Sequence, residues 1–186
     1  MTDSRTETQV SQFVRGFCSD GRTFIHKAAD LVVEASNKGE CAVIPAKKRP
    51  SRKADKNKAA PEPEPTRIPV PSTISHFVMN LPATAIEFVG CYRGVYAGRG
   101  ALFEPETTTK LPMVHVHCFS IKADDDQPIN DICERLTKYL GFSMRPGNPD
   151  VEGEVSIHNV RDVAPAKSMY CASFRIPREI AFAPRN

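Results

Sequence analysis

Two periods of apolar and polar residues run along the chain, and together they predict alternating helices and strands. In 21–35 the apolar side chains recur at i, i+3, i+4 and i+7, the pattern of a helix with one buried face. The runs 75–80 and 113–119 are short and apolar, as buried strands are, and 82–92 returns to helical spacing. A shorter apolar run at 13–18 predicts another strand before the first helix.

The second half of the chain predicts one more helix and a closing pair of strands. Acidic residues at 124–126 and Pro128 mark the start of a helix that stops at Gly141. The runs 154–163 and 168–176 are separated by a short connection and indicate a hairpin. Alternating strands and helices imply an α/β fold, with a mostly parallel sheet and an antiparallel hairpin at its carboxyl-terminal end.

Residues 36–71 interrupt this order and change the charge of the chain. Eight basic and three acidic residues give 45–71 a net charge of +5, whereas the whole chain carries +3. Alternating prolines and charges cannot bury enough apolar surface to offset ordering entropy, so we expect a disordered basic insertion at 36–71. Such a segment either contacts phosphates without sequence preference or is a solvated tail or localisation signal.

Composition excludes several classes of protein. No apolar run approaches the roughly 18 residues that span a bilayer, and the polar leader 1–12 is unlike a secretory or mitochondrial signal. The six cysteines lack C-x-x-C spacing, and four of them fall in predicted strands or helices, which indicates reduced, buried thiols and no metal site. We therefore expect a soluble intracellular protein.

The most informative local pattern is Asn80-Leu81-Pro82, directly after a predicted strand. Proline is favoured in the first turn of a helix, so Asn80 is expected at the carboxyl end of a parallel strand. Open α/β sheets bind their ligands at that edge, where an amide can donate and accept hydrogen bonds at once. The alternative is an ordinary turn in which Asn80 satisfies local backbone groups.

Asp20-Gly21 occupies the same place after the first predicted strand. In a parallel sheet both turns face one edge, so Asp20, Gly21 and Asn80 are expected to share a crevice. A carboxylate there can accept from an exocyclic amine, and glycine lets the backbone approach a purine ring. Asp20 alone is equally consistent with a helix N-cap.

Two other patterns carry less functional information. The glycines at 94, 98 and 100 follow a predicted helix, which is the wrong context for a phosphate loop, and they favour a flexible loop. His115 and His117 share one strand face, the spacing of a two-ligand metal site, but no third ligand has a credible spacing. We therefore interpret them as hydrogen-bonded strand histidines.

Four segments taken together resemble a known family: 14–25, 75–83, 114–119 and 160–177. They are similar, in order, to the eukaryotic and archaeal tRNA guanosine-37 N1-methyltransferases, which use S-adenosylmethionine. The resemblance covers about 13–35 and 72–183. It implies a partial Rossmann-like class I methyltransferase sheet, with 13–35 as one strand-helix unit and 72–186 as the remainder of the domain.

The resemblance also implies roles for the candidate residues. Asp20 and Gly21 would contact the adenine of S-adenosylmethionine, and Asn80 would lie beside the methyl donor and help to place the guanine. The partner would be tRNA, with no metal and no membrane, and the full-length enzyme would be a monomer. Members of the family work inside the cell, in the cytoplasm, nucleus and mitochondrial matrix.

The glycine-rich first loop and the catalytic Arg and Glu of the family should precede residue 13, where nothing matches them. The chain thus resembles the carboxyl-terminal part of a catalytic domain, and by itself it is expected to be inactive. Two alternatives remain open: a related aminocarboxypropyl transferase of the wybutosine pathway, and a non-catalytic RNA-binding fragment that depends on 45–71. Methyltransferases with an Asn-Pro-Pro-aromatic turn are disfavoured because Ala83 offers no ring to stack on a base.

Overall fold

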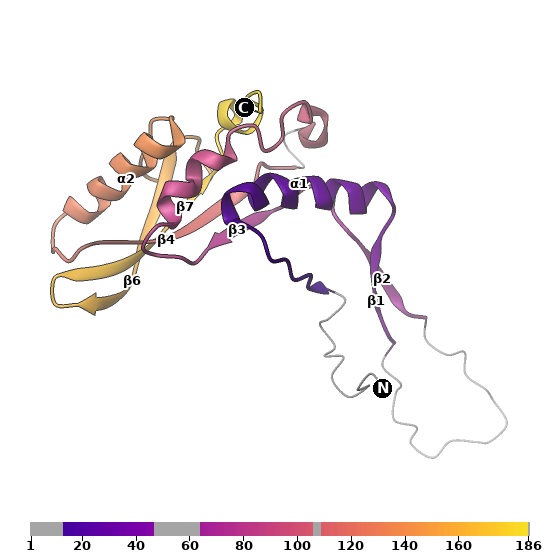
Figure 1. Cartoon of the computed structure of the whole chain (residues 1–186), viewed down its shortest axis with the longest axis horizontal. Helices are drawn as coiled ribbons and strands as arrows, with labels where there is room; N and C mark the ends of the chain where they lie inside the picture. The colour runs from indigo at the N-terminus through magenta and orange to yellow at the C-terminus, as the bar shows by residue number, and fades with distance from the viewer. Residues whose placement is uncertain (1–12, 47–63, 106–108, 186) are drawn as a thin grey trace, which may run out of the picture.

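A computed structural model describes residues 13–46, 64–105 and 109–185 of the 186-residue chain (Figure 1). Its centre is a five-stranded sheet whose spatial order is β3-β4-β7-β6-β5. The strands are β3 (His76–Met79), β4 (Met113–Ile121), β5 (Arg145–Pro146), β6 (Glu154–Ala164) and β7 (Lys167–Arg175). The runs predicted as strands at 75–80, 113–119, 154–163 and 168–176 are confirmed.

The sheet is mixed, so the prediction of a mostly parallel sheet is wrong. β3 pairs with β4 in parallel and β5 with β6 in parallel, but the longer β4–β7 and β6–β7 pairs are antiparallel. The predicted hairpin forms, yet β7 lies inside the sheet and not at its edge. Because β7 inserts between β4 and β6, the antiparallel ladders make up most of the backbone pairing.

Helical segments pack along the sheet, and Figure 1 shows them together above the strands. They are α1 (Gly21–Asn37), η2 (Ala85–Tyr92), η3 (Gly100–Phe103), α2 (Gln127–Leu140) and α3 (Arg178–Ala181). On the covered face of β4, Val114, Val116 and Cys118 are fully buried in one apolar core with residues of η2 and α2. The opposite face of β4 carries the half-buried His115 and His117.

The ends of the two long helices follow from their sequences. The Asp20 carboxylate accepts a hydrogen bond from the backbone N–H of Arg22 at 2.8 Å, so Asp20 is the N-cap of α1. Helix α2 ends at Gly141, whose φ of 71° closes the last turn through a bond from its N–H to the Thr137 carbonyl. Both helices are thereby confirmed where the periodicity predicts them.

The predicted helix at 82–92 is present only in part. Residues 85–92 form η2, a 3-10 helix, which is tighter than an α-helix. A Cβ at Gly90 would lie 2.6 Å from the carbonyl oxygen of Tyr139 in α2, so this glycine permits the close approach of the two helices.

Two sequence predictions at the amino-terminal side are wrong. Residues 14–18 form no strand, and the Phe17 ring packs against that of Phe24 with centroids 5.2 Å apart. The predicted disordered insertion 36–71 is ordered at both ends. There β1 (Cys41–Ile44) and β2 (Thr66–Pro69) pair as an antiparallel ribbon. The middle of the insertion, 47–63, and the leader 1–12 lie outside the described residues.

The loop with three glycines is packed against the carboxyl-terminal segment. The N–H groups of Gly94 and Tyr96 donate to the carbonyls of Ile180 and Ala181 at 2.8 and 2.9 Å, and Val95 and Tyr96 are fully buried. The prediction of a flexible loop therefore fails at residues 94–96. Across the described ranges, none of the helices combines the length and apolar character needed to cross a bilayer.

Candidate functional site

The Asn80-Leu81-Pro82 turn is held in place by backbone bonds on both sides. The Leu81 carbonyl accepts from the N–H groups of Thr84 and Ala85 at 3.0 and 2.8 Å. The Pro82 carbonyl accepts from the N–H of Phe119 in β4 at 3.2 Å, which ties the turn to the neighbouring strand. The Asn80 side chain is exposed, so a rigid turn presents a free amide at the carboxyl end of β3.

This end of β3 belongs to a larger polar edge of the sheet. Because β3 and β4 are parallel, their carboxyl ends share the edge, and Ile121 at the end of β4 lies opposite Lys167 of the β6–β7 hairpin. Asp162 on the hairpin pairs with Lys122 and accepts from the Ser168 hydroxyl at 2.7 Å. Its hydrogen bond with Lys122, and then that with Ser168, lowers the pKa of the Asp162 carboxyl.

The second candidate pair, Asp20 and Gly21, lies at the start of α1 beside η2. A Cβ at Gly21 would lie 3.7 Å from the Phe88 ring, and the Arg22 guanidinium stands 4.2 Å from the centre of that ring. The α1 start therefore contacts η2, and the Asn80 turn leads directly into η2. The exposed Asp20 carboxylate is chemically suited to accept a hydrogen bond from the amine of an adenine.

His115 is hydrogen-bonded, as predicted, but the prediction fails for His117, whose buried Nδ1 has no hydrogen-bond partner among the described residues. His76 Nδ1 lies 3.0 Å from His115 Nε2, and His115 Nδ1 lies 2.8 Å from the Ser173 hydroxyl. Burial lowers the pKa of His115, with smaller contributions from the charges of His76 and His117. No set of three or more His, Cys, Asp or Glu side chains within 13–46, 64–105 and 109–185 is arranged to hold a metal ion.

The prediction of buried cysteines is confirmed only in part, because Cys118 and Cys133 are buried whereas Cys18 is exposed. Cys118 and Cys171 lie in strands, Cys91 and Cys133 in helical segments, and all six thiols are free. Burial raises the pKa of Cys118 to about 11 and also raises the pKa of Cys133. Such thiols remain protonated and unreactive near neutral pH.

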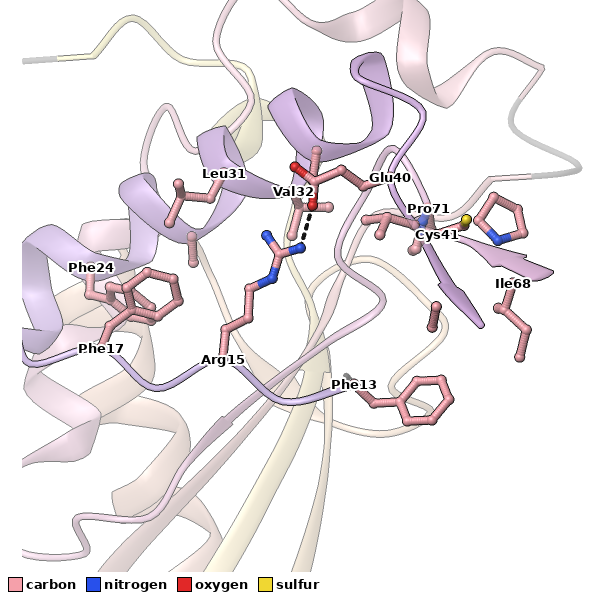
Figure 2. Close-up of a pocket in the computed structure, with 15 residues that line it drawn as sticks. Phe13, Arg15, Phe17, Phe24, Leu31, Val32, Glu40, Cys41, Ile68 and Pro71 are labelled. Atoms are coloured by element: carbon pink, nitrogen blue, oxygen red, sulfur yellow. Dashed lines mark hydrogen bonds and ion pairs between the residues drawn. The ribbon is translucent and has the colours of Figure 1, made fainter. Parts of the chain in front are cut away.

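One feature that the sequence did not indicate is an apolar cavity of about 390 Å³ beside α1. Figure 2 shows Leu31 and Val32 of α1 facing it, the Phe17 and Phe24 rings at one end and Ile68 of the ribbon near the other. The segment 13–17 crosses its mouth, where Arg15 pairs with Glu40 (Figure 2). Its lining is mostly apolar, and its polar side chains are those of Cys41 and of the paired Arg15 and Glu40.

A second unpredicted feature is a basic pocket of about 500 Å³, formed where α1, η2 and the carboxyl-terminal segment meet. Its lining residues are Arg22, Thr23, His26, Gly90, Cys91, Arg93 and Arg185. These positions lie far apart in the sequence, so no local motif could have indicated that they meet.

The chain is similar to fungal proteins named tRNA (guanine(37)-N(1))-methyltransferase. It is 70% identical over 177 residues to that of Neurospora crassa, a match to 95% of this chain and 36% of the relative. Identity is 60% over 185 residues with that of Fusarium vanettenii, covering all of this chain and 39% of the relative. With that of Saccharomyces cerevisiae it is 35% over 180 residues, covering 92% and 35%.

These similarities confirm the resemblance drawn from the four segments. The chain spans somewhat more than a third of the length of these relatives, so it corresponds to one part of them. No family model matches the sequence. No solved structure matches it either.

Proposed function

We propose that this chain forms part of an S-adenosylmethionine-dependent enzyme that methylates N1 of guanosine 37 in tRNA. The observation that carries the proposal is the rigid, exposed Asn80 turn, within a sequence 70% identical to the named Neurospora crassa methyltransferase. We further propose that the mixed sheet is the carboxyl-terminal portion of a Rossmann-like class I methyltransferase domain. Its substrate partner is tRNA.

The roles of the candidate residues follow from their chemistry. S-adenosylmethionine supplies the electrophilic methyl group when it is bound. The exposed Asp20 carboxylate accepts from the adenine amine, and the backbone at Gly21 approaches the ring. Asn80 is a neutral amide, so it orients the guanine edge and the methyl donor without adding a charge that competes with the sulfonium.

Methylation at N1 requires loss of the guanine proton, and therefore a general base. Asp162 lies on the same sheet edge, but its carboxylate is occupied by Lys122 and Ser168 and its pKa is lowered. A carboxylate with a lowered pKa is a poor proton acceptor at neutral pH. We therefore assign positioning, and not proton removal, to this part of the enzyme.

The test replaces the matching region of the Neurospora crassa enzyme with this chain and measures methyl transfer to a tRNA transcript with guanosine at position 37. We expect transfer of a methyl group to N1, identified by mass analysis of the digested nucleoside. An aminocarboxypropyl adduct would favour the related transferase of the wybutosine pathway. A folded chimera that binds both S-adenosylmethionine and tRNA yet transfers nothing would contradict the proposal.

Asn80→Ala in the chimera tests the site itself. Loss of a positioning group is expected to lower kcat about 100-fold without changing the melting temperature, because the amide is exposed. Asn159→Ala is the matched control, since Asn159 is an exposed asparagine in β6. Equal activity of the two variants would assign Asn80 an ordinary turn role.

For the 186-residue chain alone we expect weak or no binding of S-adenosylmethionine. The described connections from β3 to η2, from β4 to α2 and from β7 to α3 contain no glycine, so none offers the close backbone approach of a dinucleotide-type loop. Calorimetry with S-adenosylmethionine and a labelled-methyl assay measure this. Saturable micromolar binding with turnover by the isolated chain would show that the active site is misplaced.

A further inference from the structure

The basic pocket between α1, η2 and the carboxyl-terminal segment is built from cations. Three of its lining residues are the arginines Arg22, Arg93 and Arg185, and none of its lining residues is acidic. Two of these guanidiniums are held by neighbours, and one is not. The difference between them indicates what the pocket can bind.

Arg185 is fixed in a rigid junction. Its guanidinium donates to both carboxylate oxygens of Asp30 at 3.0 and 2.8 Å and to the Gly94 carbonyl at 3.1 Å. Arg99 also lies 2.7 Å from the same carboxylate, so two cations share one anion. The junction therefore retains positive charge, and the hydrogen bond to Arg185 is the first cause of the lowered pKa of Asp30.

Arg22 is held by its flat face. The guanidinium stacks on the Phe88 ring at 4.2 Å and lies 3.9 Å from the Asp20 carboxylate, beyond ordinary hydrogen-bonding distance. Because stacking uses the face of the group, its N–H donors remain available in the plane. Arg22 also follows Asp20 and Gly21 directly, which places the pocket beside the proposed cofactor residues.

Arg93 is the group without a partner. Its side chain is half-buried, and its guanidinium makes no hydrogen bond or ion pair with any other described residue. A guanidinium offers five N–H donors in a fork that matches two oxygens of a phosphate. The Arg93 guanidinium is partly desolvated, unpaired and lines a basic pocket, so it is suited to bind an anion through two of the anion's oxygens.

The remaining groups of the pocket are compatible with a bound anion but offer no contact that would recognise a nucleotide base. His26 Nε2 lies 2.8 Å from the Cys91 carbonyl, which can only accept, so that nitrogen is the donor and fixes the ring. The Phe88 face is already covered by Arg22, so the pocket lacks a free ring on which a base could stack. Charge without a stacking platform favours a phosphodiester backbone.

We propose that this pocket binds the phosphodiester backbone of an RNA, with Arg93 as the bidentate contact and Arg22 and Arg185 as flanking charges. The choice of RNA over a free anion rests on the proposed function. Arg22 lines the pocket and directly follows Asp20 and Gly21, the proposed cofactor residues at the start of α1. The contact is independent of base sequence. It positions RNA next to Asp20 and Gly21 without selecting its sequence.

The test is titration of the purified 186-residue chain into a labelled tRNA transcript at 50 to 300 mM salt. Arg93→Gln is expected to weaken binding about tenfold and to reduce the slope of log affinity against log salt by about one. Arg93→Lys keeps the charge and is expected to retain the slope while losing part of the affinity. An unstructured RNA of equal length should show the same losses, because no base is read.

Arg145→Gln is the matched control, since Arg145 of β5 is an exposed arginine that pairs with Glu154 of β6. The proposal is wrong if Arg93→Gln binds RNA as tightly as Arg145→Gln does and has an unchanged melting temperature. It is also wrong if the parent chain fails to bind RNA at 50 mM salt. Displacement of the RNA by low-millimolar inorganic phosphate would assign the pocket to a free anion instead. RNA affinity is measured without methyl transfer, and Arg145→Gln should keep that affinity, so failure of methyl transfer and failure of this pocket are separate results.

Discussion

Helices α1 and α2 are both amphipathic, but α2 buries more of its apolar stripe than α1 does. Leu136 of α2 is 0% exposed and packs in the core with residues of η2 and β4. Leu31 of α1 is half-buried and lines the open cavity of about 390 Å³. Periodicity thus indicates which face of a helix is apolar, whereas its burial depends on the surface that packs against it.

The largest effect is expected for Leu136→Ala. Removing a fully buried leucine side chain forfeits transfer free energy and leaves a cavity, at a cost of about 3 kcal/mol in the free energy of unfolding. Urea denaturation followed by circular dichroism measures it. A loss below about 1 kcal/mol would mean that α2 can collapse into the space and that its packing is looser than the structure shows.

Gly94→Ala is expected to cost about 2 kcal/mol. Gly94 has a φ of 74°, and a Cβ there would lie 2.9 Å from the Ala183 carbonyl oxygen. Gly98→Ala is the control, because its φ of 72° carries the same conformational cost but no atom lies within 4 Å of its Cβ. Thermal melting should show a lower melting temperature for Gly94→Ala than for Gly98→Ala. Equal losses of stability would mean that the contact of residue 94 with the carboxyl-terminal segment does not contribute to the cost.

Asp30→Asn is expected to cost about 1 kcal/mol at pH 7, a modest value because the carboxylate is 40% exposed and screened by solvent. Its pKa is lowered in the folded protein, first by the hydrogen bond from Arg185. The stabilisation is therefore complete above the ordinary pKa of 3.8 and is lost as pH falls through the lower folded value.

The measurement is the difference in unfolding free energy between parent and Asp30→Asn from pH 7 to pH 2. It should be constant at neutral pH and shrink below about pH 4. Asp124→Asn, at an exposed position before α2, should show no comparable loss. A difference that grows on acidification would contradict the sign of the pKa shift.

Leu31→Ala is expected to have the smallest effect, below about 1 kcal/mol, since the side chain already faces an open cavity. It is the same chemical change as Leu136→Ala on the other helix. If the two variants lose equal stability, the cavity beside α1 is closed in solution and the contrast between the helices disappears.

The sequence predicts individual elements better than their arrangement. Helical spacing, the Asp20 cap and the Gly141 stop are local signals, and α1 and α2 form where they indicate. The place of β7 between β4 and β6 depends on pairing across more than forty residues, which no local pattern encodes. Residues 14–18 are apolar enough for a strand, but Phe17 finds its partner in Phe24 of α1.

The candidate site was predictable to the same degree. Asn80 was indicated because a strand, a turn and a proline are adjacent in sequence, and the structure gives that turn its bonds to β4. The basic pocket was missed because Arg22, Arg93 and Arg185 come from three distant segments. Contacts of that kind arise only when the chain has folded.

The position of β7 also bears on how the sheet assembles in time. β6 and β7 are joined by two residues, so their ladder closes a short loop, whereas β4 must find β7 across a long one. Because short loops cost less entropy, we expect the hairpin to be an early scaffold on which β4 and then β3 dock. Substitutions in the hairpin should therefore slow refolding, and those in β3 should mainly accelerate unfolding.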